Sequence, residues 1–246
     1  MSEKRTAIKS EIRRRRAIQK RNQYIIIGVV VLILVAVIWI MVASQASEAS
    51  PTAASSTGGN AAPTTAAAGN AAPTVQAMQF ATPPPMTIDV KKQYFATVVM
   101  AKGGQFVMQL YPDKAPVTVN SFVFLANKGF FNGTTFHRVL EGFMAQAGDP
   151  TGTGNGGPGY QIPDEPNVLQ FDKAGVVAMA NTGQPNSGGS QFFITFAPQV
   201  YLNGGYTIFG QVISGIDVVN GLTRRDPTQN PTFTGDAIES VTISEK

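Results

Sequence analysis

Residues 136–149 read FHRVLEGFMAQAGD and hold the densest group of chemically distinct side chains in the sequence. A cation, an aromatic ring, a thioether and an amide occur within nine residues, as Arg138, Phe143, Met144 and Gln146. On one strand Arg138, Met144 and Gln146 would share a face, because side chains alternate along a strand. Phe143 would need a bulge or a twist to join them, so alternation alone does not assemble a site.

Two other motifs suggest chemistry, and their surroundings argue against it. Residues 152–157, GTGNGG, match the glycine pattern of dinucleotide-binding loops, but Pro158 and Pro163 follow, so no helix can begin cleanly there. We interpret this segment as an ordered loop. Ser190 lies in GGSQF and not in the G-x-S-x-G motif of a serine hydrolase. The only histidine, His137, is the sole candidate for a catalytic base. We therefore do not predict a serine-hydrolase site.

Three further blocks lie downstream of the first one, with the sequences AMAN at 178–181, GSQFF at 189–193 and FGQV at 209–212. With FHRVLEGFMAQAGD they resemble, in order and spacing, the cyclophilin-type peptidyl-prolyl cis-trans isomerases. The similarity runs from about Tyr94 to Lys246. It implies a mainly β fold, a closed antiparallel eight-stranded barrel capped by two helices.

The resemblance also implies roles for individual residues. Arg138 would be the catalytic arginine, and Gln146 would steady the rotating carbonyl. The proline pocket would consist of Phe143, Met144, Phe193 and Leu202. The peptide backbone would be hydrogen-bonded by Gln146, Asn181 and Gln191. Ala180 would line the groove. Tyr201 and Tyr206 would also contact the substrate at the pocket. They stand where the best-known members carry tryptophan and histidine, which bears on cyclosporin sensitivity more than on catalysis.

Three residues near these blocks receive structural roles. We expect His137 to be a hydrogen-bonded structural histidine beside the site. Asp149 and Asp164 are expected to be loop residues and not catalytic acids. With no cysteine and a single histidine, thiolate and paired-histidine metal sites are excluded, and nothing in the sequence suggests a cofactor.

Local patterns predict the elements of the folded part, which we place at residues 88–246. Strand-like segments occupy 94–101, 105–111, 175–180, 191–196, 207–213 and 237–244. Helices are expected over 116–128, which begins with proline and ends before Gly129, and over 215–222. Many short strands with two helices suggest a barrel with helices over its ends.

The N-terminal part differs in composition. Residues 1–22 carry a charge of +7 and the rest of the chain −3, so the basic balance describes a tail and does not predict nucleic-acid binding. Residues 24–43 are uncharged and long enough for a transmembrane helix, since about 20 residues span the hydrocarbon core. Residues 44–87, rich in Ala, Thr, Pro and Gly, are expected to be a disordered tether.

The span at 24–43 allows two interpretations. We favour an uncleaved signal anchor over a cleaved signal peptide, because the apolar run exceeds the usual length of a signal core. The positive-inside rule places residues 1–23 in the cytoplasm and the domain outside the cytoplasmic membrane. The basic tail then determines topology, with RNA binding, a specific lipid or a cytoplasmic partner as weaker alternatives.

These observations predict a membrane-anchored isomerase that acts on proline-containing exported polypeptides as they fold. Rotation about a peptide bond meets a barrier of about 18–20 kcal/mol, and an enzyme need only favour the twisted amide. The alternative is a non-catalytic proline-peptide-binding module or chaperone on the same barrel. The retained Arg138 argues against that alternative, since binding does not require a cation there. We expect a monomer without bound nucleic acid.

Overall fold

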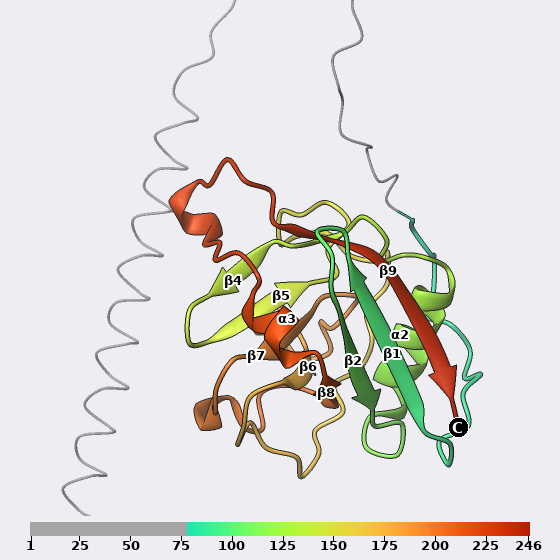
Figure 1. Ribbon diagram of the computed structural model, residues 1–246. Helices are drawn as coiled ribbons and strands as arrows, with labels where there is room; N and C mark the ends of the chain where they lie inside the picture. The colour runs from blue at the N-terminus through green and yellow to red at the C-terminus, as the bar shows by residue number, and fades with distance from the viewer. Residues whose placement is uncertain (1–77) are drawn as a thin grey trace, which may run out of the picture. The chain divides into compact units, whose positions relative to one another are not determined.

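The structure is a computed structural model that describes residues 78–246 (Figure 1). The predicted basic tail at 1–23, the predicted span at 24–43 and the tether up to residue 77 lie outside the described residues. Within residues 78–246, no helix has the length and apolar character needed to cross a membrane.

Nine strand segments form one antiparallel sheet, in the order β3-β9-β1-β2-β8-β6-β7-β5-β4. Figure 1 shows β9, β1 and β2 side by side, with β4 and β5 on another side of the barrel. Their bounds in chain order are β1 (Tyr94–Met100), β2 (Gln105–Leu110), β3 (Thr135–Phe136), β4 (Arg138–Leu140), β5 (Met144–Ala147), β6 (Val176–Met179), β7 (Phe192–Thr195), β8 (Ile208–Ser214) and β9 (Asp236–Glu245).

The two edge strands of the sheet, β3 and β4, are neighbours in the sequence. β3 and β4 are separated by His137 alone, although they lie at opposite ends of the sheet. The sheet therefore curves until its edges approach each other, which makes a nearly closed barrel. The expected eight strands become nine segments because His137 interrupts what would otherwise be one continuous strand.

Two helices accompany the barrel, as the local patterns predict. Helix α2 (Pro116–Asn127) packs against β9, and the short α3 (Ile216–Asn220) packs against β2. Two single-turn 3-10 helices, η1 (Val200–Leu202) and η2 (Pro227–Gln229), lie in the connections.

The N-terminus of α2 is capped from a distant part of the chain. Ala115, at the N-cap position, has no side chain that could accept a hydrogen bond. The carboxylate of Glu165 replaces it, accepting hydrogen bonds from the backbone N–H groups of Val117 and Thr118 at 2.9 and 2.8 Å. A negative charge at this end also interacts favourably with the helix dipole. The loop before β6 is thereby fastened to α2.

The main core is rich in phenylalanine. Phe122 projects from α2 and contacts the rings of Phe131, Phe192 and Phe209, with centroids 4.8 to 5.6 Å apart. All four side chains are fully buried. A second, smaller cluster is built on Met144, Phe171 and Phe193 and is separate from this core. That second cluster contains most of the apolar residues predicted to bind substrate.

Candidate active site

The stretch at 136–149 is a hairpin and not one strand. β4 and β5 pair antiparallel, with Arg138 opposite Gln146 and Leu140 opposite Met144. Val139 and Ala145 are buried in the main core, while Arg138 and Gln146 are partly exposed. Cross-strand pairing therefore places the predicted catalytic pair side by side, because directly opposed residues in antiparallel strands share one face.

The turn between the two strands places Phe143 next to Arg138 without a bulge in either strand. The backbone N–H of Phe143 donates to the carbonyl of Leu140 at 3.1 Å, which closes the turn. The ring centroid of Phe143 then lies 5.8 Å from the guanidinium carbon of Arg138. A cation at this distance from an aromatic ring is attracted by the ring electrons, which helps to orient Arg138.

The predicted proline pocket is brought together in the second cluster. Met144 and Phe193 are buried there, and Phe143, Ala180, Leu202 and Tyr206 pack against them. The Tyr206 ring meets Phe193 edge-on, with centroids 5.2 Å apart. A rigid apolar surface of this kind suits a proline ring, because its burial is favourable at about 25 cal/mol per Å².

Tyr201 lies at the rim of this cluster and not within it. Its side chain is 69% exposed, and its ring leans on Phe143 with centroids 6.2 Å apart. Of the two tyrosines at the positions where the sequence departs from the best-known members, only Tyr206 therefore packs within the cluster.

The predicted backbone-binding amides form an ordered network. Nε2 of Gln146 donates to Oε1 of Gln191 at 2.8 Å. Nε2 of Gln191 donates to the carbonyls of Gly154 and Gly156 at 2.9 and 2.8 Å. Gln191 thus positions Gln146 and uses both of its own amide hydrogens within the protein. Gln146 keeps Oε1 and one Nε2 hydrogen for a substrate.

Asn181 is held in a similar way on another loop. Its Nδ2 donates to the carbonyl of Gly205 at 3.1 Å, and its Oδ1 accepts the backbone N–H of Gly183 at 3.1 Å. One amide hydrogen remains for a ligand. Because both amide groups are already engaged, Asn181 and Gln191 are oriented before any substrate arrives.

A hollow of about 930 Å³ lies beside the apolar cluster. Ala180 lines the hollow and packs against the apolar cluster, while Gln146 lines the hollow and stands opposite Arg138 on β4. No charged side chain lines the hollow, and its walls combine amides, hydroxyls and backbone with apolar groups such as Pro158 and Ala180. The wall residues outside the predicted set include Gln79, Tyr160, Ser190 and the loop 154–159.

Asp149 organises the loop that forms one wall of this hollow. Its buried carboxylate accepts hydrogen bonds from the N–H groups of Thr151, Gly154 and Gly156. Burial alone would raise the pKa of Asp149, but these hydrogen bonds outweigh it and hold the pKa below its usual range. The carboxylate therefore stays ionised and structural, in accord with its predicted role as a loop residue.

His137 lies under the site, and its expected hydrogen bonds are absent. The side chain is 1% exposed, and neither ring nitrogen has a hydrogen-bond partner among the described residues. Burial lowers the pKa of His137, while the nearby Asp149 carboxylate opposes the shift. The structure confirms the buried, structural position of His137, but the predicted hydrogen bond is not found among the described residues.

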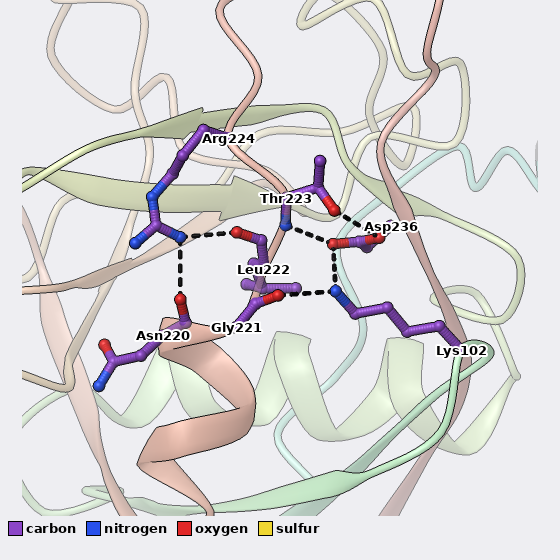
Figure 2. A network of polar contacts seen from close by, with 7 residues as sticks. All are labelled: Lys102, Asn220, Gly221, Leu222, Thr223, Arg224 and Asp236. Carbon is purple, nitrogen blue, oxygen red and sulfur yellow. Dashed lines mark hydrogen bonds and ion pairs between the residues drawn. The ribbon is translucent and has the colours of Figure 1, made fainter.

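Residues 220–225, which follow α3, support the edge of β4 that is not paired with β5. No local pattern in the sequence predicted this contact. Figure 2 shows Lys102 donating to the carbonyl of Gly221 and to Asp236, each at 2.8 Å, while Thr223 N–H also donates to Asp236. The segment 220–224 is thereby fixed. Arg225 follows it and pairs with Val139 through two backbone hydrogen bonds of 2.7 and 2.9 Å.

The side chain of Arg225 strengthens this edge. Its guanidinium donates to the carbonyls of His137 and Phe233. Arg138 is therefore flanked by two backbone positions that Arg225 restrains.

Within residues 78–246, no group of three histidine, aspartate or glutamate side chains is placed to hold a metal ion.

Comparisons with known proteins agree on the family. The family model "Cyclophilin type peptidyl-prolyl cis-trans isomerase/CLD" matches residues 95–243. The mouse "Peptidyl-prolyl cis-trans isomerase-like 1" is 48% identical over 141 residues, which is 56% of this chain and 82% of the mouse protein. "Peptidyl-prolyl cis-trans isomerase B" of Bacillus subtilis is 45% identical over 138 residues, 56% of this chain and 94% of that protein.

A solved structure supports the same conclusion. The crystal structure of a Cryptosporidium parvum cyclophilin-type isomerase superposes with a TM-score of 0.57 and 31% identity, covering 63% of this chain and 99% of that chain. The similarity thus extends over the barrel, its helices and the hairpin that carries Arg138. On the sequence blocks, the fold and these relatives together, this chain belongs to the cyclophilin-type peptidyl-prolyl cis-trans isomerases.

Proposed function

We propose that this isomerase acts on Xaa-Pro bonds of exported polypeptides, with Arg138 as the catalytic donor. The observation that carries the proposal is the cross-strand pair Arg138 and Gln146 beside an apolar cluster that can hold a proline ring. Uncatalysed Xaa-Pro isomerisation takes about 10–100 s, which is slow compared with most folding steps. A folding chain that emerges from a membrane would therefore benefit from a catalyst nearby.

Arg138 supplies the interaction that is stronger in the twisted state than in either planar isomer. When the amide twists, the proline nitrogen becomes pyramidal and gains a lone pair that a guanidinium can hydrogen-bond. Arginine is charged at every physiological pH and has a rigid donor geometry. A preorganised donor of this kind is worth about 10²–10³ in rate.

The neighbouring residues hold the two halves of the substrate. The cluster of Met144, Phe193 and Leu202 would grip the proline ring, so that the acyl side of the bond turns. Gln146, oriented by Gln191, would steady the rotating carbonyl through its remaining Nε2 hydrogen. No bond is made or broken, and no proton has to be transferred.

The catalytic part of the proposal is tested with Arg138→Ala in the full chain, with Lys91→Ala as a control that removes an exposed cation elsewhere. We expect kcat/KM for an Xaa-Pro peptide to fall about 10²–10³-fold in Arg138→Ala and to stay unchanged in the control. An unchanged kcat/KM in Arg138→Ala would overturn the mechanism. The rival peptide-binding module would predict that only binding changes.

The site of action follows from the N-terminal sequence. Residues 24–43 are long and apolar enough for an anchor, and nine Lys or Arg residues precede them. We propose a single-pass protein with its catalytic domain on the outer face of the cytoplasmic membrane. Protease added to right-side-out cells should digest the domain. Protection of the domain in intact cells, with digestion only after lysis, would disprove this topology.

A further inference from the structure

Residues 79–88 lie against the domain and reach the hollow beside the apolar cluster. The family match begins at residue 95, so this segment stands outside it. Residues 79–87 belong to the region predicted to be a disordered tether, and the structure differs there, because hydrogen bonds and a ring contact hold them against the domain. We call residues 79–88 the strap.

The first attachment of the strap is to the loop that walls the hollow. Nε2 of Gln79 donates to the carbonyl of Gly157 at 2.9 Å, and the backbone N–H of Phe80 donates to the carbonyl of Pro158 at 2.8 Å. Gly159 has a φ of +92°, and a Cβ atom there would lie 2.7 Å from the carbonyl oxygen of Phe80. The loop and the strap therefore fit closely only because residue 159 is glycine.

The second attachment is to helix α2. The rings of Phe80 and Phe124 meet edge-on, with centroids 5.0 Å apart. Asn120, which is buried, donates to the carbonyl of Pro85 at 3.0 Å and accepts the N–H of Thr87 at 2.9 Å. With anchors at both ends, the strap holds Gln79 at a definite place on the wall of the hollow.

The chemistry of the hollow indicates what it accepts. The hollow is continuous with Gln146, the neighbour of Arg138, and its walls carry no charged side chain. The amides and hydroxyls of the wall can hydrogen-bond an uncharged polar side chain, whereas a charged one would lose part of its hydration without gaining an oppositely charged partner. Gln79 supplies one of these amides from outside the barrel.

We propose that Gln79 is a specificity-determining residue, which contacts a substrate side chain near the proline and favours uncharged polar residues there. The inference rests on the assignment of Arg138, Gln146 and the apolar cluster as the place where the Xaa-Pro bond turns. It concerns the selection of substrates and not the rotation itself. The strap thus makes the junction between domain and tether part of the substrate groove.

The test uses the full chain in detergent micelles and peptides that carry Gln, Lys or Glu at each position within three residues of the Xaa-Pro bond. A minimal Xaa-Pro peptide, too short to reach the hollow, reports the isomerase activity by itself. The variants are Gln79→Glu and its reciprocal Gln79→Lys. Gln93→Glu is the matched control, since Gln93 is exposed and lies outside the hollow.

At one peptide position we expect the unmodified chain to prefer Gln over both charged residues. Gln79→Glu should raise the ratio of kcat/KM for the Lys peptide to that for the Glu peptide about fivefold to tenfold. The new carboxylate would attract the lysine of one peptide and repel the glutamate of the other, and both charges would be partly exposed to water. Gln79→Lys should shift the same ratio in the opposite direction. Turnover of the minimal peptide should not change.

Two results would overturn the proposal. One is an unchanged Lys-to-Glu ratio at every position in both Gln79 variants. The other is an equal change of the ratio in Gln93→Glu, which would indicate a general effect of charge on the domain. If the unmodified chain failed to turn over the minimal peptide, the proposed function would fail instead, so the two failures are distinguishable.

Discussion

Gln146 and Gln191 are joined side chain to side chain, with 2.8 Å between Nε2 of the first and Oε1 of the second. They come from β5 and from the residue before β7, 45 positions apart in the sequence. Through Gln191 the pair also reaches the carbonyls of Gly154 and Gly156. A single amide therefore connects the neighbour of Arg138 to the loop that walls the hollow.

Gln191→Ala should reduce kcat/KM about tenfold, because Gln146 loses its partner and the loop loses two hydrogen bonds, each worth about 0.5–1.5 kcal/mol. Amide exchange at Gly154 and Gly156 should accelerate. Gln191→Glu separates the two effects, since it keeps an acceptor for Gln146 and loses the donor to the loop. Slow exchange at both glycines in Gln191→Ala would contradict this role.

Arg225→Ala should lower kcat about fivefold to thirtyfold while KM stays nearly constant, since each of the two lost hydrogen bonds is worth about 1 kcal/mol and about 1.36 kcal/mol is tenfold in rate. The backbone pairing with Val139 would remain, but the side-chain contacts to His137 and Phe233 would be lost. Arg225→Lys, which keeps the charge without the planar fork, should recover part of kcat. The measurement is the separate determination of kcat and KM, and a change in KM alone would argue against positioning of Arg138.

Glu165→Ala should lower the free energy of unfolding by about 1–2 kcal/mol, because the first turn of α2 loses its capping carboxylate. The free energy of unfolding of Glu165→Gln should lie between those of Glu165→Ala and the unmodified chain. An amide oxygen can still accept one of the hydrogen bonds, but it lacks the favourable charge. Urea unfolding followed by far-ultraviolet circular dichroism provides the comparison. Equal stability of Glu165→Ala and the unmodified chain would show that the cap contributes nothing.

Stability should fall as the pH drops below about 6.5, the ordinary pKa of histidine. Burial lowers the pKa of His137 in the folded state, so the unfolded chain binds a proton first, and unfolding becomes easier until the lowered folded pKa is passed. The slope in this window should reach at most about 1.4 kcal/mol per pH unit. His137 is the only histidine in the chain, so the assignment is direct.

The matched variant for this prediction is His137→Gln, which should remove the slope that begins below about pH 6.5, whatever its effect on overall stability. Asp149 acts in a separate window. Its pKa is lowered in the folded state, so its contribution is present above the ordinary carboxyl pKa and is lost only at more acid pH. A slope near pH 6 that persists in His137→Gln would rule out His137 as its source.

The sequence by itself determined the elements and most of the residues that meet at the site. The alternation in 94–101 and 105–111 and the proline-to-glycine boundaries of 116–128 are local signals, and each corresponds to an observed strand or helix. The order of four sequence blocks was enough to identify the family. These properties depend on neighbours within a few residues, where backbone preference and side-chain periodicity act directly.

Only the tertiary structure decided how those residues meet. One-strand alternation left Phe143 apart from Arg138, whereas the hairpin turn brings them together. The cap of α2 by Glu165 and the attachment of Gln79 join positions 47 and 78 residues apart. No local preference encodes such contacts, because they exist only once the sheet has curved round and its two ends have met at His137.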